Sequence, residues 1–186
     1  GWHERQIGLT DDKLSIGLNK NPSIAPQLTA RIEDTAEGDI VEINPQTRAI
    51  ATQIGSHIET YKGAALIIDY GDWRSLGDTV QAVKDHQYSD LLAAPGEADL
   101  TAHVDFEAIM NAASCSASRL TPQGVLLERL GITPRAQALA KKLSGPALEQ
   151  HIAAHRRLTH PDEMGKVFKA LALFPKASPP PPGFQT

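Results

Sequence analysis

The sequence predicts an α/β fold, and two observations carry this prediction. Ala64 to Tyr70 begins with five consecutive apolar residues. Unbroken apolarity is typical of a strand covered on both faces, as in a parallel sheet flanked by helices. The preceding segment, Pro45 to Tyr61, has apolar residues at helical spacing, and a helix followed by a strand is the order found in α/β proteins. We therefore expect Ala64 to Tyr70 to be the most buried strand.

The first part of the chain predicts short strands. Trp2 to Leu9 and Leu14 to Leu18 flank a polar turn at residues 10–13, which predicts a β-hairpin. Residues 19–30 contain two prolines and are expected to form a loop. Asp39 to Ile43 is expected to be a short strand.

Asn44-Pro45 predicts the start of a helix, because Asn caps helices well and Pro is tolerated in the first helical position. Gly63 is expected to end this helix, just before the apolar strand. The face that we expect to be buried carries Ile50, Ile54, Ile58 and Tyr61.

Two acidic residues predict further helix starts. Asp78, with Gln81 three residues later, resembles a capping box and predicts a helix that ends near His86. Asp105 is expected to cap the next helix. Its apolar positions are Phe106, Ile109, Met110 and Ala113. Ser116 to Leu120 is expected to be a strand.

The following segment is predicted to be mainly helical. Thr121-Pro122 and Thr133-Pro134 each predict a helix start, and Gly131 and Gly145 predict helix ends. A third helix is expected over residues 146–158.

The sequence of the C-terminal segment leaves its secondary structure open. Val167 to Phe174 is compatible with either a helix or a strand. Residues 178–182 include four consecutive prolines, which predict an extended, solvated tail. The alternative for this tail is a proline-rich ligand for another protein.

Composition excludes several classes of function. The 186 residues, 41% of them hydrophobic, suffice for a domain with a core. A net charge of -4 with scattered Lys and Arg gives no general attraction to nucleic acid. Cys115 is the only cysteine, so an intrachain disulfide is impossible. No apolar run approaches the roughly 18 residues that span a bilayer, and no signal peptide is recognised.

Polar residues at expected strand ends and helix starts are the candidate site. Asp69 and Tyr70 follow the apolar strand directly, and ligands of open parallel sheets collect beyond the carboxyl ends of strands. Asp99 and His103 lie just before the helix capped by Asp105. The alternatives remain open: Asp69 as a cap of a nearby amide in a turn, Asp105 as an N-cap, and His103 as a surface histidine.

Other patterns point away from metal and nucleotide chemistry. His151 and His155 have the spacing of two zinc ligands on a helix, but no glutamate lies between them to act as a base. A packing role for His155 is favoured, and we expect no metal site. No P-loop or dinucleotide-binding glycine motif is present.

Six segments together resemble one family. They are "GWHER", "GDIVEINP", "ALIIDYG", "GDTVQAVKDHQYSDLLAAPGEADLTAHVDF", "TPQGVLLERLGI" and "MGKVFKALA". Their order is similar to that in the MidA-like family of class I S-adenosylmethionine-dependent methyltransferases. Mitochondrial members are complex I assembly factors that methylate a protein arginine. The segment from Asp78 to Phe106 is most similar to bacterial members.

The resemblance implies a fold for the whole chain. It implies the C-terminal part of a Rossmann-like methyltransferase sheet, with an inserted β-hairpin and a helical insertion before the last strand. Val167 to Phe174 would be that last, antiparallel strand. The implied divisions are 1–44 for the hairpin and strand insertion, 45–120 for the helix-strand core, 121–160 for the helical insertion, 161–176 for the last strand and 177–186 for the tail.

The family's Gly-rich cofactor loop and a second motif upstream of "GWHER" are absent from the sequence. The resemblance therefore implies a C-terminal half, with S-adenosylmethionine as co-substrate of the full-length enzyme and cofactor-binding residues unassigned here. We do not assign Glu42 to the cofactor, since the family's acidic ribose-binding segment comes earlier. The chain alone is expected to be inactive. A non-catalytic binding or assembly module is the alternative.

For arginine methylation, a carboxylate must hold and deprotonate a guanidinium, and carboxylates pair with guanidinium bidentately. The expected catalytic residues are Asp69, Tyr70 and Asp99. The expected substrate-binding residues are Thr101, His103 and Asp105. Expected partners are a protein substrate, the N-terminal half of the domain and a second copy of the chain, without nucleic acid or membrane insertion. The expected compartment is the bacterial cytoplasm, or the mitochondrial matrix in a eukaryote.

Overall fold

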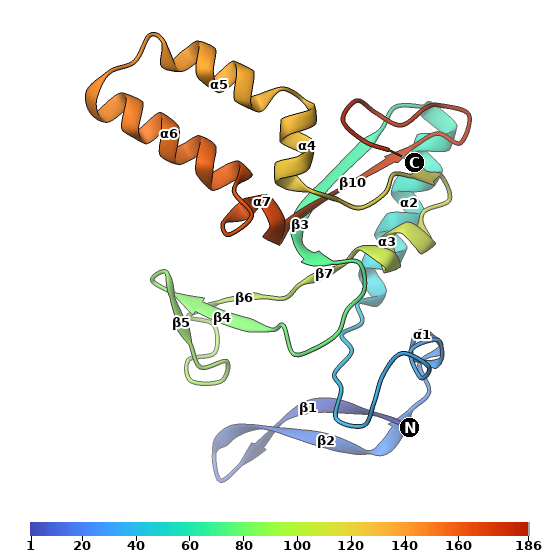
Figure 1. Ribbon diagram of the computed structural model, residues 1–186. Coiled ribbons are helices and arrows are strands. Elements are labelled where there is room, and N and C mark those ends of the chain that lie inside the picture. The colour runs from blue at the N-terminus through green and yellow to red at the C-terminus, as the bar shows by residue number, and fades with distance from the viewer. Residues whose placement is uncertain (186) are drawn as a thin grey trace. The chain divides into compact units, whose positions relative to one another are not determined.

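The computed structural model describes residues 1–185, which divide into two compact units. Unit 1 contains residues 1–43 and 76–103, and unit 2 contains residues 44–75 and the chain from residue 104 onward. Each unit is described by itself, and Figure 1 shows their elements. Within residues 1–185, no helix combines the length and apolarity that crossing a membrane requires.

A mixed sheet forms the centre of unit 2. Its strand order is β7 (Val104–Asp105), β3 (Ala65–Asp72), β10 (Phe168–Phe174) and β8 (Ser116–Ala117), and β9 (Thr121–Pro122) also pairs with β10. β3 runs parallel to β7 and antiparallel to β10. The segment that was compatible with helix or strand is therefore the antiparallel strand that the resemblance implied.

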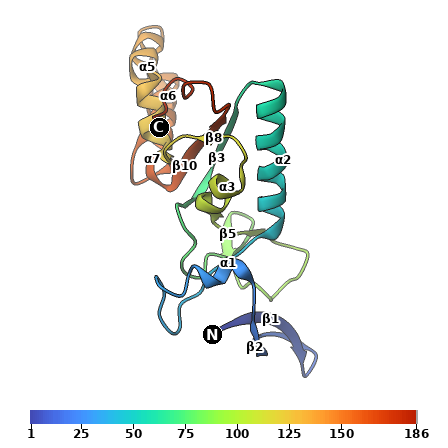
Figure 2. The ribbon, with the colours of Figure 1, turned by 90° about the vertical axis from the view of Figure 1, so that its right-hand side faces the viewer.

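Helices lie on both sides of β3 and β10. Figure 2 shows α2 (Pro45–Tyr61) on one side and the pair α5 (Ile132–Ala140) and α6 (Gly145–Thr159) on the other. α3 (Phe106–Ala112) packs on α2, while α4 (Gln123–Arg129) and α7 (Met164–Val167) contact β10. The buried cluster of this unit consists of Ala51, Ile58, Phe106, Ile109, Leu171 and Leu173.

Unit 1 consists of small antiparallel sheets and a short helix. β1 (Trp2–Thr10) and β2 (Lys13–Ser23) form the predicted hairpin, followed by α1 (Pro26–Thr29). The turn residues Asp11 and Asp12 both have positive φ, as in the type I′ turns that suit two-residue hairpins. A second sheet has the order β5 (Gln87–Ser89), β4 (Gln81–Lys84) and β6 (Asp99–Thr101).

The prediction of a helix from Asp78 to His86 is wrong, because residues 81–86 belong to the β4–β5 hairpin and residues 78–80 are in neither helix nor strand. Asp85 and His86 have φ of 50° and 62° and make its two-residue turn. The carboxylate of Asp78 forms an ion pair with Arg5 at 2.6 Å. The capping-box pattern therefore occurs here although no helix begins at Asp78.

Two predictions for the segment before α2 are also wrong. Asp39 to Ile43 is not a strand: Ile40 accepts a hydrogen bond from Gly77 N at 2.8 Å, and the Glu42 carboxylate binds Thr79, so this segment is held by isolated polar contacts. Residues 19–30 are not all loop, since β2 continues to Ser23 and α1 follows.

The predicted start of α2 is confirmed, but the prediction of its buried face is partly wrong. Asn44 Oδ1 accepts hydrogen bonds from Gln46 N and Thr47 N. The buried residues are Ala51, Gly55 and Ile58, whereas the predicted Ile50 and Tyr61 are exposed. Gly55 explains the difference: a Cβ there would lie 2.6 Å from Ser114 N, so the helix approaches this backbone along its Gly55 side.

The helical insertion is present, although its predicted boundaries shift. Thr121 and Pro122 pair with β10 as β9, and α4 begins at Gln123 without a side-chain cap. α5 begins before Thr133, directly after Gly131, which does end α4 with φ of 83°. Gly145 is the first residue of α6 and does not end a helix.

β10, not β3, is the most buried strand. Ala170 to Phe174 are each 2% exposed or less, whereas Leu66 and Ile68 on β3 are 55% and 43% exposed. β3 pairs with β7 only at Gly71 and Asp72, so most of its outer edge carries no strand among the described residues. The strand predicted over Ser116 to Leu120 is limited to Ser116–Ala117.

The proline-rich tail is not simply solvated. Arg119 N donates a hydrogen bond to Gln185 O at 2.8 Å, and the Arg129 guanidinium donates to Gly183 O. A Cβ at Gly183 would lie 2.7 Å from a methyl carbon of Leu126, so the tail packs closely on α4. Residue 186, at the end of the predicted tail, lies outside the described residues.

The burial difference between β10 and β3 gives a stability prediction. Leu171→Ala should lower the free energy of unfolding by about 2–5 kcal/mol, since it leaves a cavity between β10 and the helices. The control Leu66→Ala, in the neighbouring strand, should cost less than about 1 kcal/mol because that side chain is already half in water. Urea unfolding measures both, and equal losses would contradict the burial of β10.

Candidate functional site

Asp69 and Tyr70 lie near the carboxyl end of β3, in unit 2. Asp69 Oδ1 accepts a hydrogen bond from Tyr70 N at 2.8 Å. One oxygen of this carboxylate therefore has the amide-capping role that was the structural alternative. The Tyr70 ring meets the Phe168 ring edge-on, with centroids 5.7 Å apart. Both predicted residues are half-buried.

A cation that the sequence did not single out lies at the same strand end. Lys169 is the cross-strand neighbour of Asp69, and its Nζ donates a hydrogen bond to Gly71 O at 2.9 Å. This end of β3 therefore presents an acid, a phenol and an ammonium. Only the β3–β10 register reveals Lys169, because 98 residues separate it from Gly71 in sequence.

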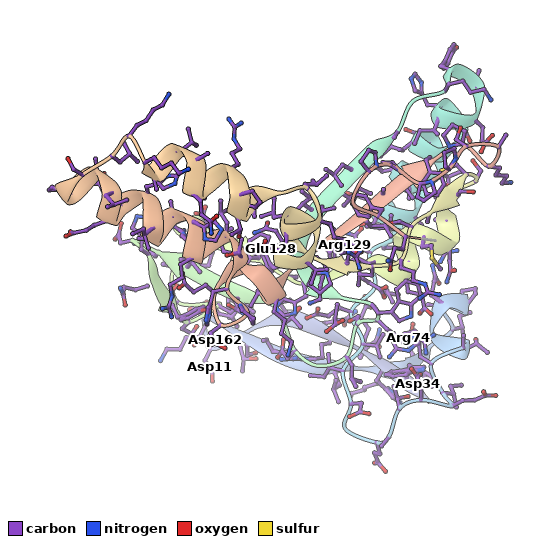
Figure 3. The ribbon with its side chains drawn as sticks, turned by 45° about the horizontal axis from the view of Figure 1, so that its top comes forward. Asp11, Asp34, Arg74, Glu128, Arg129 and Asp162 are labelled. Atoms are coloured by element: carbon purple, nitrogen blue, oxygen red, sulfur yellow. The ribbon has the colours of Figure 1, made fainter. Side chains whose placement is uncertain are left out.

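Asp105 has the structural role that the alternative assigned to it. Its Oδ1 accepts from Ala108 N at 2.9 Å at the start of α3, and its Oδ2 accepts from Ser75 N at 3.4 Å. Glu107 N also donates to Trp73 O, and the Glu107 carboxylate pairs with Arg74, labelled in Figure 3. Asp105 thus joins the start of α3 to the chain that follows β3.

The other three predicted residues lie in or next to β6, in unit 1. Asp99 pairs in register with Val83 and is exposed, and Thr101 pairs with Gln81 and is half-buried. His103 is exposed, and its backbone N donates to Thr79 Oγ1 at 2.9 Å.

A hydrogen-bond network holds His103 in place. Thr79 N donates to Glu42 Oε1 at 2.7 Å, and the Thr79 hydroxyl donates to the other Glu42 oxygen while accepting from His103 N. One threonine therefore connects Glu42 to the segment that carries the predicted residues. No sequence pattern indicates this network, because its three residues are separated by 37 and 24 positions.

The predicted site residues are divided between the units. Asp69, Tyr70 and Asp105 belong to unit 2, and Asp99, Thr101 and His103 belong to unit 1. Within each unit the residues lie on neighbouring or consecutive segments. Their union into one cleft stays a prediction.

The remaining candidates have packing environments. His151 Nε2 lies 2.9 Å from Ala136 O, and His155 Nε2 lies 3.0 Å from the Thr133 hydroxyl, so both histidines join α6 to α5. Burial raises the pKa of the Cys115 thiol, which disfavours a reactive thiolate. Residues 1–185 contain no group of three or more His, Cys, Asp or Glu side chains placed to hold a metal ion.

Three glycines permit close approach, and at each of them the close neighbour is protein backbone. Gly71, Gly124 and Gly165 approach protein backbone: an added Cβ would lie 2.1–2.4 Å from a carbonyl oxygen at each, so their closeness serves packing. An open hollow of about 470 Å³ lies in unit 1. Its lining is Asp12, Lys13, Leu14, Asp90, Leu92, Ala93 and Pro95, with no aromatic side chain to stack on adenine.

An α/β sheet with helices on both sides and an antiparallel last strand defines the class I methyltransferase fold. The chain belongs to the family described as "Putative S-adenosyl-L-methionine-dependent methyltransferase", whose family model matches residues 1–125. The resemblance found in the sequence is thereby confirmed, and S-adenosylmethionine is the co-substrate for which this family is described.

Relatives match nearly the whole chain. The protein arginine methyltransferase NDUFAF7, mitochondrial, of Xenopus laevis is 34% identical over 201 residues, which cover 100% of this chain and 46% of the relative. The Homo sapiens protein of the same name is 34% identical over 94% of this chain and 40% of its own length. The chain therefore spans about half the length of the relatives it matches.

Solved structures match the fold in the same way. An uncharacterised protein from Burkholderia thailandensis aligns with a TM-score of 0.78 and 25% identity over 96% of this chain and 50% of that one. A second structure from Burkholderia thailandensis, bound to S-adenosyl-homocysteine, aligns with a TM-score of 0.75 and 26% identity, and covers 96% and 48% of the two chains.

The two contacts of Asp105 predict a graded response to substitution. Asp105→Ala should cost about 0.5–2 kcal/mol, because it removes the cap of α3. Asp105→Asn should cost less, since Asn keeps a capping oxygen. Thermal unfolding of the two variants beside wild type measures this, and an Asn variant as unstable as the Ala variant would show that the charge, not the cap, is what matters.

Proposed function

We propose that this chain is part of an S-adenosylmethionine-dependent methyltransferase that acts on a protein arginine. The observation that carries the proposal is the 34% identity, across the chain, to relatives named protein arginine methyltransferases. The acids support it chemically, because a carboxylate can pair with a guanidinium through two hydrogen bonds and accept its proton. The relatives are named mitochondrial, so we propose the matrix for a eukaryotic source and the cytoplasm for a bacterial one.

In this proposal the chain supplies the acceptor side of the enzyme. Asp69 and Asp99 hold the guanidinium, while Tyr70, Thr101 and His103 orient it. Asp105 contributes mainly by fixing the start of α3, as its hydrogen bonds indicate. A further part of the domain binds the cofactor. The protein that is methylated takes part in the assembly of respiratory complex I.

A non-catalytic assembly module is the second candidate. It is favoured by one observation on the sequence, which lacks the glycine-rich cofactor loop of the family. The two candidates differ in whether the acids matter for turnover.

Substitution of the acids in the enzyme that contains this chain separates the candidates. Asp69→Asn and Asp99→Asn keep shape and remove charge, so each should lower the methylation rate of a protein acceptor roughly 30- to 1,000-fold, or about 2–4 kcal/mol of transition-state stabilisation. Asp90→Asn, a control on an exposed loop of unit 1, should leave the rate unchanged. Unchanged turnover in both acid variants, with altered melting temperatures, would assign these residues to structure alone.

The sequence also gives a binding prediction for the 186-residue chain itself. Calorimetric titration with S-adenosylmethionine should show weak binding or none, because the chain lacks the glycine-rich loop that holds the cofactor in the family. Micromolar binding by this chain alone would contradict the proposal that a further part of the domain holds the cofactor.

A further inference from the structure

The segment that carries three of the proposed site residues has little backbone pairing. β6 is three residues long and, within residues 1–185, pairs with β4 alone, beside which Figure 1 shows it. The register places Asp99 opposite Val83 and Thr101 opposite Gln81. Alternate residues of a strand share a face, so Asp99 and Thr101 point to the same side. The end of so short a strand frays unless another contact holds it.

Thr79 continues this pairing beyond the last backbone pair. The register that sets Gln81 opposite Thr101 also sets Thr79 opposite His103, two residues further along each segment. Neither Thr79 nor His103 belongs to a strand. The Thr79 hydroxyl instead accepts a hydrogen bond from His103 N at 2.9 Å. A side chain therefore provides the contact that a backbone carbonyl gives within a ladder, and it holds the main chain at His103.

Glu42 sets the direction of the Thr79 hydroxyl. A hydroxyl has one proton and a carboxylate only accepts, so this proton points to Glu42 Oε2 and the hydroxyl lone pairs are left for His103 N. Glu42 Oε1 accepts from Thr79 N at 2.7 Å. A backbone hydrogen bond of 2.8 Å, from Gly77 N to Ile40 O, joins the same two segments. The position of Glu42 relative to Thr79 is therefore fixed at more than one point.

We propose that Thr79, oriented by Glu42, is a positioning residue for the protein acceptor. This rests on the proposed function, in which Thr101 and His103 orient the guanidinium. Neither Thr79 nor Glu42 touches the acceptor. Glu42 aligns the hydroxyl, the hydroxyl holds His103 N, and the held main chain keeps Thr101 and His103 in place. Displacing groups that orient a substrate by about 1 Å slows a reaction by on the order of 100-fold.

Steady-state methylation of a protein acceptor by the enzyme that contains this chain tests the proposal. Thr79→Val keeps the shape of the side chain and removes both hydrogen bonds of the hydroxyl. It should raise KM for the acceptor and lower kcat/KM about 10- to 100-fold, while KM for S-adenosylmethionine stays unchanged. Thr79→Ser keeps the hydroxyl and should retain most of the wild-type kcat/KM. Glu42→Gln offers one acceptor oxygen to the two donors of Thr79, so its effect should lie between these two.

Thr35→Val is the matched control. Thr35 is also a half-buried threonine of unit 1, and its hydroxyl donates to the backbone carbonyl of Arg31, outside the network of Glu42, Thr79 and His103. Its substitution removes a similar hydrogen bond and should leave both KM values unchanged. Hydrogen exchange followed by mass spectrometry reports the contact without turnover. The His103 amide should exchange faster in Thr79→Val than in wild type, Thr79→Ser or Thr35→Val.

The outcomes distinguish this proposal from the proposed function. A wild-type enzyme that methylates no protein acceptor refutes the proposed function, and the positioning role with it. If wild type is active, an unchanged acceptor KM in Thr79→Val overturns the positioning role alone, because a smaller folded fraction lowers kcat without changing KM. Equal effects of Thr79→Val and Thr35→Val, or unchanged exchange at His103, also overturn it. If Thr79→Val does not fold, the comparison of Glu42→Gln with Thr35→Val decides in the same way.

Discussion

The burial of β10 is the constraint on which unit 2 depends. This strand pairs with β3 on one edge and with β8 and β9 on the other, so its neighbours come from two separate parts of the chain, residues 65–72 and 116–122. Its side chains from Ala170 to Phe174 are almost inaccessible. Leu171 and Leu173 complete the cluster built by α2 and α3. Without β10, α2, α4 and α7 would lose a strand that each of them contacts.

The polar residues of the candidate site are also structural residues. Asp69 accepts an amide of its own strand, Asp105 caps α3, and His103 is held through Thr79 by Glu42. Hydrogen bonds of this kind restrict side chains and backbone to one geometry, which a site that orients a substrate requires. A structural contact and a functional role are therefore compatible for Asp69, whose Oδ1 accepts the amide of Tyr70. Both oxygens of Asp105 accept backbone amides, which agrees with its mainly structural role.

Glycines at close contacts explain how several elements approach one another, which sequence patterns did not reveal. A Cβ at Gly71 would lie 2.3 Å from Val104 O, so β3 and β7 can pair only with glycine there. Gly55 has the same effect on α2, because a Cβ there would meet the backbone of Ser114. Gly183 has a φ of 84° and lies close to the side chains of Leu126 and Leu130 on α4. In each case the partner is distant in sequence, so the reason for the glycine is visible only after folding.

The sequence by itself determined the local elements and the family. The β1–β2 hairpin, the Asn44 cap and the Asp105 cap follow from short-range chemistry, because their hydrogen bonds join residues close in the chain. Tertiary structure decided the rest. Residues 81–84 became a strand because β5 and β6 pair with them, β10 became the buried centre because β3 and β8 flank it, and Glu42 and Lys169 acquired partners 37 and 98 residues away. Contacts at such separations depend on how the whole chain packs, and no local pattern encodes them.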